Sequence, residues 1–205
     1  DQSKKYIYKE NKKLDKYRYG FLDNVIDIFL NDKSSKVSNI ITDDFNYFIR
    51  YGIGNIKENL FLESIITIYN FHNPNNIIIN VDEIRKIMAK NIKNKSNLFN
   101  SLNSGQLYVY FKNFHDNPLE QFVNYIKLYN GNINELFIID YLTRKNDWFF
   151  KSGVNIVIFD YDAENEKGFL RCYNNIDPFY NFNIHRPTIF LYYNQNYNMY
   201  EPIIK

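Results

Sequence analysis

The residues best suited to nucleophilic chemistry are few and lie far apart along the chain. The one cysteine is Cys172, and the three histidines are His72, His115 and His185. A catalytic thiol needs a helix N-terminus or a neighbouring histidine to lower its pKa. Cys172 instead falls in residues 169–173, an apolar run that predicts a strand. We therefore expect Cys172 to be a packing residue and the histidines to be structural or at the surface.

A second chemical possibility is a cation site built from acidic side chains. Asp160, Asp162, Glu164 and Glu166 alternate directly after an apolar segment, and carboxylate oxygens are the ligands that Ca²⁺ and Mg²⁺ prefer. Their spacing lacks the glycine and the final glutamate of a calcium-binding loop, so it favours an acidic turn between two strands. No histidine pair stands at helical metal spacing, and one cysteine cannot form a Cys-rich zinc site. The sequence therefore predicts no metal and no cofactor; residues 52–54 also lack the third glycine of a dinucleotide-binding loop.

The composition describes a chain with an apolar core and little net charge. Hydrophobic residues make up 45% of the 205 positions, with 19 Tyr and 18 Phe, and the net charge is +2. A chain of this length buries about 70% of its unfolded surface and needs no disulfide to fold. The many Ile, Asn, Lys, Tyr and Phe share AT-rich codons, so coding bias explains this composition. The small net charge excludes polyanion binding over the whole surface. No apolar run has the roughly 18 residues that a membrane span needs. The single cysteine fits a reducing compartment.

The first 18 residues are polar and basic. They contain seven lysines and arginines and three acidic residues, namely Lys4, Lys5, Lys9, Lys12, Lys13, Lys16 and Arg18 against Asp1, Glu10 and Asp15. We expect residues 1–18 to form a solvated arm and residues 19–205 to form a single domain. A phosphate-binding arm is the alternative interpretation. The start of the chain resembles neither a signal peptide nor an initiator, which predicts a piece excised from a larger protein.

Helical patterns occupy the first two thirds of the chain. Apolar residues recur at helical spacing over residues 21–30, 59–71 and 81–91. Between the third of these segments and the next helix, residues 92–105 are rich in Asn, Ser and Lys, which predicts a loop or a mobile connection.

Two capping signals predict further helices. Asn117 is followed by Pro118 and Glu120, the residues preferred at the N-cap and at the first and third helical positions, and the helix they open runs to about residue 129. Asn132 with Glu135 three residues later predicts a helix that ends near residue 143.

The last quarter of the chain changes to the pattern of strands. Residues 154–159, 169–173, 188–193 and 197–203 predict strands, and the polar residues 194–196 turn the last two into a hairpin. Helices first and strands last favour an α+β fold with helices packed on a small, mostly antiparallel sheet.

The order of these segments resembles that of the ovarian-tumour (OTU) type of papain-like cysteine protease, a deubiquitinase fold. In that family a motif of the type Asp-Gly-Asn-Cys-Leu-Phe-Arg-Ser-Ile opens the central helix. Asn59, Ser64 and Ile65 match this pattern, and Phe61 and Leu62 take its two apolar positions. Later in the family a helix leads into a strand beneath the site, and the predicted helix and strand between residues 135 and 159 are similar to that pair.

The resemblance places apolar residues where the family has its reactive ones. Leu60 falls on the position of the nucleophilic cysteine, and Lys57 falls where an aspartate precedes it. The family ends in a strand, a turn and a strand of the type His-Tyr-x-x-Val, which residues 189–203 resemble with Met199 on the histidine position. Leucine and methionine can neither attack a carbonyl nor carry a proton. The resemblance therefore implies a catalytically inactive, papain-like domain.

Such a pseudoenzyme would act as a protein–protein interaction or structural module, with a ubiquitin-like partner by family analogy. The segments at residues 48–52 and 200–203 are also similar to domains coded by large AT-rich DNA viruses. That similarity implies a viral protein in the host cytoplasm, in a virus factory or in the virion.

Two other functions remain open from the residues alone. The basic N-terminal arm and the many surface lysines and tyrosines are typical of a nucleic-acid-binding module. An active enzyme with an unrecognised site would use His115 or His185 with an acidic neighbour.

Overall fold

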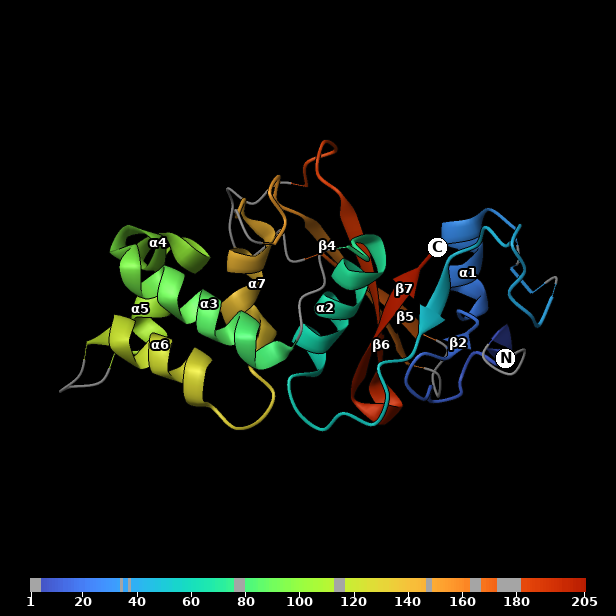
Figure 1. Cartoon of the computed structure of the whole chain (residues 1–205), viewed down its shortest axis with the longest axis horizontal. Helices are drawn as coiled ribbons and strands as arrows, with labels where there is room; N and C mark the ends of the chain where they lie inside the picture. Colours follow the sequence, from blue (N-terminus) through green and yellow to red (C-terminus); the bar gives the residue numbers. More distant parts are fainter. Residues whose placement is uncertain are drawn as a thin grey trace.

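The computed structural model describes eight stretches of the chain, and for residues 96 and 167–172 it describes the backbone alone; the stretches are residues 5–33, 35–36, 38–75, 80–112, 117–146, 149–162, 167–172 and 182–205. Figure 1 shows an elongated molecule in which a sheet and its covering helices occupy one part and the helices α3 to α6 the other. The two chain ends lie in the part that contains the sheet.

The strands form one mixed sheet. In chain order they are β1 (Ile7–Tyr8), β2 (Tyr19–Gly20), β3 (Ile49–Tyr51), β4 (Asn155–Asp162), β5 (Lys167–Cys172), β6 (Thr188–Asn194) and β7 (Met199–Ile204). Their order in the sheet is β1-β2-β3-β7-β6-β4-β5. The β1–β2 and β4–β6 pairs are parallel, and the β2–β3, β3–β7, β6–β7 and β4–β5 pairs are antiparallel. The predicted α+β class and the β6–β7 hairpin are confirmed, within a sheet that mixes both directions.

The α-helices of the described residues are α1 (Asn24–Asn31), α2 (Leu60–His72), α3 (Val81–Asn94), α4 (Ser96–Ser101), α5 (Leu107–Tyr110), α6 (Pro118–Leu128) and α7 (Glu135–Thr143). Two 3₁₀ turns accompany them, η2 (Leu102–Gly105) and η4 (Gln195–Tyr197). The first predicted helix begins three residues later than its apolar pattern, because Phe21 and Leu22 precede α1 and are buried outside it.

The prediction of a loop over residues 92–105 is wrong. α3 continues to Asn94, and α4 and η2 fill most of the remaining segment. Phe99 and Leu102 are buried here in the same apolar cluster as the α3 and α6 side chains. Burial of these two side chains outweighs the weak helix propensity of the surrounding Asn and Ser residues.

Asparagine side chains open three helices. Asn80 accepts a hydrogen bond from the Glu83 amide at α3, and Asn117 accepts one from Leu119 at α6, as the capping signal predicts. At α7 the cap is Asn134, which accepts from the Leu136 amide. The prediction that Asn132 starts α7 is therefore wrong, and the side chain of Asn132 is used elsewhere.

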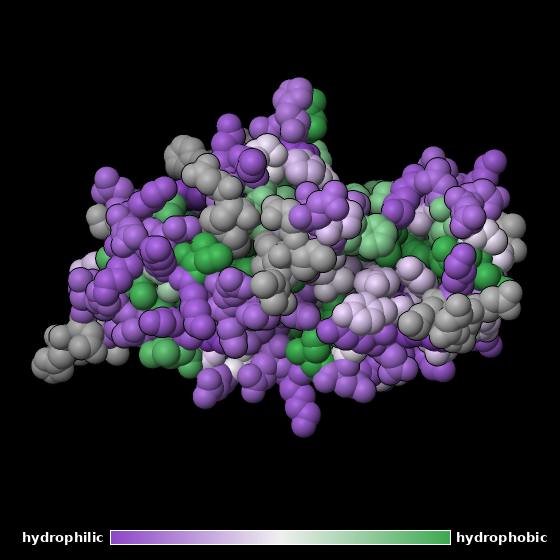
Figure 2. Space-filling view, in the orientation of Figure 1, coloured by the Kyte–Doolittle hydropathy of each residue, from purple (hydrophilic) through white to green (hydrophobic). Residues whose placement is uncertain are grey.

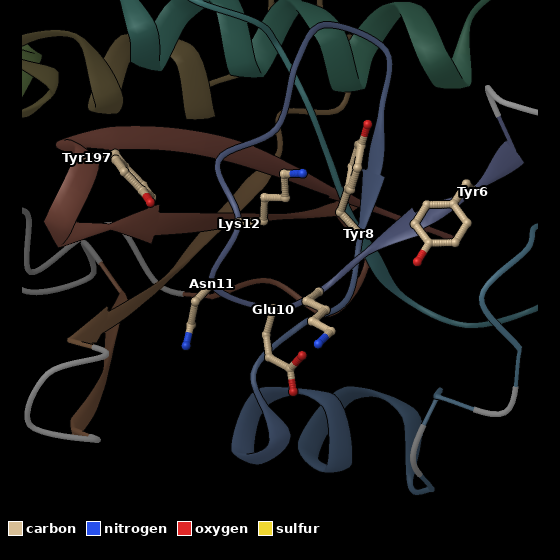
Figure 3. A pocket seen from close by; sticks show the side chains of 7 residues that line it. Tyr6, Tyr8, Glu10, Asn11, Lys12 and Tyr197 are labelled. Carbon is tan, nitrogen blue, oxygen red and sulfur yellow. The ribbon is translucent and has the colours of Figure 1, made fainter.

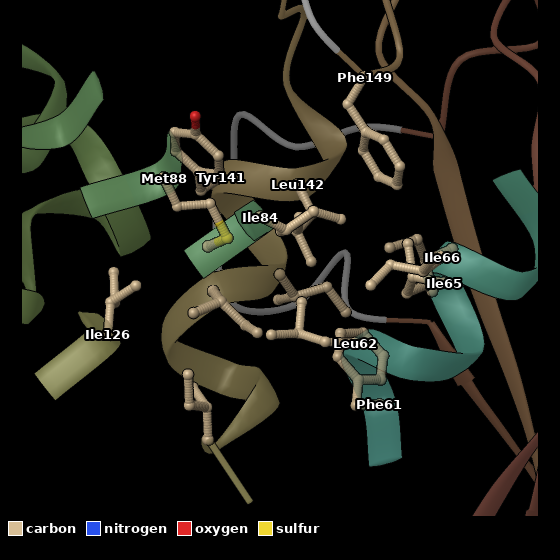
Figure 4. Close-up of a cluster of buried hydrophobic side chains, with 14 of the residues drawn as sticks. Phe61, Leu62, Ile65, Ile66, Ile84, Met88, Ile126, Tyr141, Leu142 and Phe149 are labelled. Carbon is tan, nitrogen blue, oxygen red and sulfur yellow. The ribbon is translucent and has the colours of Figure 1, made fainter. Parts of the chain in front are cut away.

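The sheet carries apolar side chains on both faces. Along β4, Ile156 and Ile158 face the main core, while Val157 and Phe159 face the second, smaller cluster, as the two-residue period of a strand requires. The main core lies between the sheet and α2 and α7, and it continues to α3 and α6 (Figure 4). On the opposite face α1 is the covering helix, through Ile26.

The basic N-terminal segment packs onto the domain. β1 joins the edge of the sheet, and Ile7 and Leu14 are fully buried. The structure thus differs from the expected solvated arm over residues 1–18: its described part, residues 5–18, hides two apolar side chains and exposes the lysines between them. β1 and β2 belong to the same sheet as β3 to β7, so this segment is joined to the sheet formed by the later strands.

Candidate functional site

The predicted protease-like position lies where the first turn of α2 meets the start of β7. Here the Phe61 and Tyr200 rings are 5.4 Å apart, and the Ser64 hydroxyl donates a hydrogen bond to the Tyr200 carbonyl over 3.2 Å. We call this region, with Asn59, Leu60 and Met199, the α2–β7 junction. The structure therefore brings together the two segments that the sequence resemblance pairs.

The two junction residues that the sequence resemblance singles out, Leu60 and Met199, have buried apolar side chains. Leu60 is 9% exposed and Met199 is 3% exposed, and both belong to the main core cluster. Side chains buried in this way fill space and exclude water, and neither can exchange a proton or form an acyl bond.

The first amide of α2 already has a partner. The Leu60 amide donates to the Asn132 side-chain oxygen over 3.1 Å, and the Asn132 side-chain nitrogen donates to the Lys57 carbonyl over 3.5 Å. A helix N-terminus is a ready anion site because its amides lack intrahelical partners. Asn132, from the loop before α7, therefore occupies this amide, which is not available to bind an anion.

Asn59 precedes α2 in a left-handed conformation, with φ 56° and ψ 32°. Asparagine tolerates this conformation better than most residues. Its side chain is buried, and among the described residues its Oδ1 atom has no hydrogen-bond partner. On the other side of the junction, the Tyr200 hydroxyl donates to Glu135 over 2.8 Å and ties β7 to the first turn of α7.

The remaining sequence candidates do not meet at the junction. His72 ends α2 and His185 precedes β6, and both are exposed. His115 lies outside the described residues. Cys172 ends β5, which β4 and β6 separate from β7 in the sheet, and its side chain is not described.

The acidic cluster is described in part. Asp160 accepts a hydrogen bond from Gln195 over 2.6 Å, and Asp162 ends β4, while Glu164 and Glu166 lie outside the described residues. Within the part of the chain that the structure describes, no three acidic, histidine or cysteine side chains are grouped as metal ligands.

A second candidate site is a cleft beside the N-terminal segment. It has a volume of about 670 Å³ and is lined by Tyr6, Tyr8, Lys9, Glu10, Asn11, Lys12 and Tyr197. Figure 3 shows Tyr6 and Tyr8 on one side, Tyr197 on the other and Lys12 between them. We call it the N-terminal cleft.

Charged groups in the N-terminal cleft are arranged around Tyr8. The Lys12 ammonium lies 4.4 Å from the centre of the Tyr8 ring, and the Arg18 guanidinium donates to the Tyr8 hydroxyl over 3.0 Å. Glu10 is paired with Lys36, their charged atoms being 2.5 Å apart. Burial raises the pKa of Glu10, but the hydrogen bond and charge of Lys36 outweigh it and leave that pKa below its ordinary value. The acidic member of the lining is therefore neutralised by its own partner.

A buried arginine anchors the loop that carries the cleft lysines. Arg50 on β3 forms an ion pair with Glu201 on β7 over 2.6 Å, and both side chains are fully buried. Its other donors reach the carbonyls of Lys9 (3.0 Å), Lys12 (3.3 Å) and Phe21 (2.7 Å). Three segments far apart in sequence are thus joined at one guanidinium.

Further buried polar groups extend this anchor. The Tyr192 ring lies 5.2 Å from the Arg50 guanidinium, and the Tyr192 hydroxyl donates to Asp23 over 2.7 Å. Burial raises the pKa values of Asp23, Glu201 and Tyr192 above their ordinary values. Desolvation, the largest cause in each case, outweighs the Arg50 charge that favours the ionised carboxylates.

Sequence reasoning missed both Arg50 and Asn132. A signal for the first exists, because Arg50 and Glu201 each interrupt a short apolar strand, and a charge in such a strand needs a partner of opposite sign. No comparable signal marks Asn132, because one asparagine in a polar turn is ordinary.

Comparisons with known proteins found no matching family model, no matching curated protein and no matching solved structure. In the residues that the structure describes, no helix has both the length and the apolar character to cross a bilayer.

Proposed function

We propose that the chain is a catalytically inactive OTU-like domain that acts through protein–protein contacts. The observation that supports the proposal is the α2–β7 junction: Leu60 and Met199, which the sequence resemblance aligns with the thiol and imidazole of a papain-like protease, are both buried in the main core. Under this proposal leucine and methionine replace the nucleophile and the base, and the Asn132 side chain takes the Leu60 amide that would serve as an oxyanion donor.

A separate surface supports a role in binding. On α1, Val25, Ile28 and Phe29 are 68%, 57% and 67% exposed, and their i, i+3 and i+4 spacing puts them on one face. Ile26 packs against the sheet, and the Phe29 ring also lies 5.9 Å from the Phe159 ring on β4. Contiguous exposed apolar side chains such as these mark interaction surfaces. Figure 2 shows hydrophobic residues at the surface in the part of the molecule where α1 lies.

The first experiment tests the protease-like geometry. In a Cys172→Ser background, Leu60→Cys and the double variant Leu60→Cys/Met199→His each carry one thiol. If the two positions face each other, the added imidazole lowers the pKa of the new thiol. The rate of alkylation by iodoacetamide, measured against pH, should then rise at lower pH in the double variant. Equal pH profiles in the two variants contradict the OTU-like arrangement.

The second experiment tests inactivity in the unmodified chain. Ubiquitin with a thiol-reactive group at its C-terminus should form no adduct, as judged by intact mass. An adduct on Cys172 would show an active thiol and contradict the proposal.

The third experiment tests the α1 surface. The wild-type chain, Val25→Ser/Phe29→Ser and the control Leu128→Ser serve as baits in affinity capture from cell extract. Leu128 on α6 is also exposed, at 64%, so the control removes an apolar side chain of similar exposure. Proteins held by the wild type and by Leu128→Ser should be lost with the α1 variant. Identical capture by all three baits contradicts a role for α1.

A further inference from the structure

The N-terminal cleft combines exposed aromatic rings and lysines, and the loop that carries Lys9 and Lys12 is hydrogen-bonded to the buried Arg50. We propose that this cleft binds single-stranded nucleic acid, with phosphates on its lysines and bases stacked on its tyrosines. The inference concerns a different surface from α1 and from the α2–β7 junction, so it stands or falls independently of the proposed protein contact.

The rings at the two sides of the cleft are partly exposed to solvent, and the Tyr6 ring makes a T-shaped contact with the Tyr8 ring, with ring centres 5.8 Å apart. Tyr6 is 42% exposed and Tyr197 is 46% exposed, and they stand on opposite sides in Figure 3. Tyr8 differs, because Lys12 and Arg18 lie at 4.4 and 5.0 Å from its ring centre. Stacking of a base on an aromatic side chain is tolerant of sequence, since every base has a π-face.

The cations of the cleft are presented by an ordered loop. Lys9, Lys12 and Lys13 are exposed, while the Lys9 and Lys12 carbonyls point inward to Arg50. The negative ends of these peptide groups are thereby turned away from the cleft. Glu10 is paired with Lys36. The surface offered to a ligand is consequently positive, and the Lys13 ammonium lies 6.0 Å from the Tyr197 ring centre.

The shape of the cleft favours a single strand. A volume of about 670 Å³ falls in the range of small-molecule pockets, which hold groups of the size of a nucleotide. A duplex keeps its bases stacked inside, where Tyr6 and Tyr197 cannot reach their faces. A single strand exposes bases and phosphates together, which matches the alternation of rings and ammonium groups here.

A second lysine-rich groove in the molecule serves as a control. It lies between α3 and α6, has a volume of about 420 Å³, and is lined by Lys86, Lys90, Lys93, Lys127, Glu120, Ala89, Asn94, Val123 and Asn124. Its described lining contains no aromatic ring. Lys93 is paired with Glu120 over 3.1 Å. Removing charge from this groove changes the net charge of the chain without touching the N-terminal cleft.

The experiment measures binding of the full chain to a fluorescein-labelled 12-nucleotide oligothymidylate by fluorescence anisotropy over a series of salt concentrations. The variants are Lys9→Gln/Lys12→Gln, Tyr197→Ala and the control Lys86→Gln/Lys90→Gln. The lysine pair should lower the salt slope by about 0.7 for each lysine. Tyr197→Ala should weaken binding by about 5- to 150-fold with an unchanged slope, and the control should bind as the wild type does.

Several results would overturn the proposal. They are no binding at low salt, binding that ignores salt, and equal losses in the control and the cleft variants. A duplex of the same length that binds as tightly, with Tyr197→Ala unaffected, would indicate a general polyanion surface and also refute it. Unlabelled oligothymidylate should compete, whereas inorganic phosphate and polyglutamate should not when they supply the same concentration of anionic groups. Equal competition by these anions would refute recognition of bases. Circular dichroism of each variant checks that these exposed substitutions leave the fold intact.

Discussion

The α2–β7 junction and the N-terminal cleft use neighbouring residues of one hairpin in opposite ways. Met199 is buried in the junction, whereas Tyr197, two residues earlier, lines the open cleft. In the junction the Leu60 amide donates its hydrogen bond to Asn132, and the Leu60 and Met199 side chains are buried in the main core. In the cleft the carbonyls of Lys9 and Lys12 accept hydrogen bonds from the buried Arg50, while the side chains of these lysines remain exposed. Internal partners thus close one site and leave the other available to a ligand.

The largest effect is expected at the anchor beneath the cleft. Arg50→Met leaves Glu201 buried without its ion-pair partner and removes the donor to three carbonyls. Breaking a buried ion pair from one side costs about 3–5 kcal/mol, and urea unfolding should show a loss of that size in the free energy of unfolding. Arg50→Met/Glu201→Gln should recover part of it, because the carbonyls remain unpaired. A loss below about 1 kcal/mol would mean that Arg50 does not hold the loop.

The next prediction compares the two residues of the hairpin directly. Met199→Ala should lower the free energy of unfolding by about 2–5 kcal/mol, because it opens a cavity in the main core. Tyr197→Ala should change it by less than about 0.5 kcal/mol, as expected for a surface position. Met199→Leu, which keeps the volume, should cost under about 1.5 kcal/mol. Equal losses of unfolding free energy for Met199→Ala and Tyr197→Ala would contradict the difference in burial between the α2–β7 junction and the N-terminal cleft.

A smaller effect is expected where Asn132 meets α2. Asn132→Ala removes the acceptor of the Leu60 amide and should cost about 1 kcal/mol in urea unfolding, as for the loss of a helix cap. Asn132→Asp keeps an acceptor at the helix N-terminus, where negative charge is favourable, and should be at least as stable as the wild type. A neutral Asn132→Ala would show that this amide is satisfied by water and that the junction is more open than described.

The smallest effect concerns Asp23 and pH. Burial raises the pKa of Asp23, so the folded chain retains a proton at pH values where the unfolded chain has lost it. Stability from this group is therefore greatest in acid and falls as pH rises from about 4 through the folded pKa. Asp23→Asn cannot titrate. The wild type should lose free energy of unfolding relative to Asp23→Asn over that range in urea titrations. A wild-type stability that stays constant or rises with pH, relative to Asp23→Asn, would contradict the assignment.

The sequence predicts the parts of this fold that rest on local pattern. α2 and α6 follow from helical spacing and from the cap at Asn117, and β4, β6 and β7 follow from apolar runs closed by turn residues. Residues 92–105 escape prediction because the segment is fixed by the burial of Phe99 and Leu102 against other segments. Local propensity cannot report that burial.

The candidate sites are predictable to different degrees for the same reason. A resemblance in segment order is sufficient to pair α2 with β7. The N-terminal cleft depends on the pairing of β3 with β7 and on Arg50, which acts on residues 9, 12 and 21 from a distance in sequence. No spacing rule reveals such contacts. The basic composition of residues 1–18 indicated a phosphate-binding surface without showing that the segment is folded onto the sheet.

The position of β7 has a consequence for how the chain reaches this structure. β7 comes last of all the strands along the chain, yet it lies between β3 and β6. A nascent polypeptide that has emerged only as far as residue 198 therefore has two half-sheets whose facing edges are both unpaired. Such edges are templates for wrong pairing, and closing them joins residues about 150 positions apart in sequence, which makes folding slow. Completion of the sheet therefore requires β7, and a protease that removes residues 199–204 would split the sheet in two.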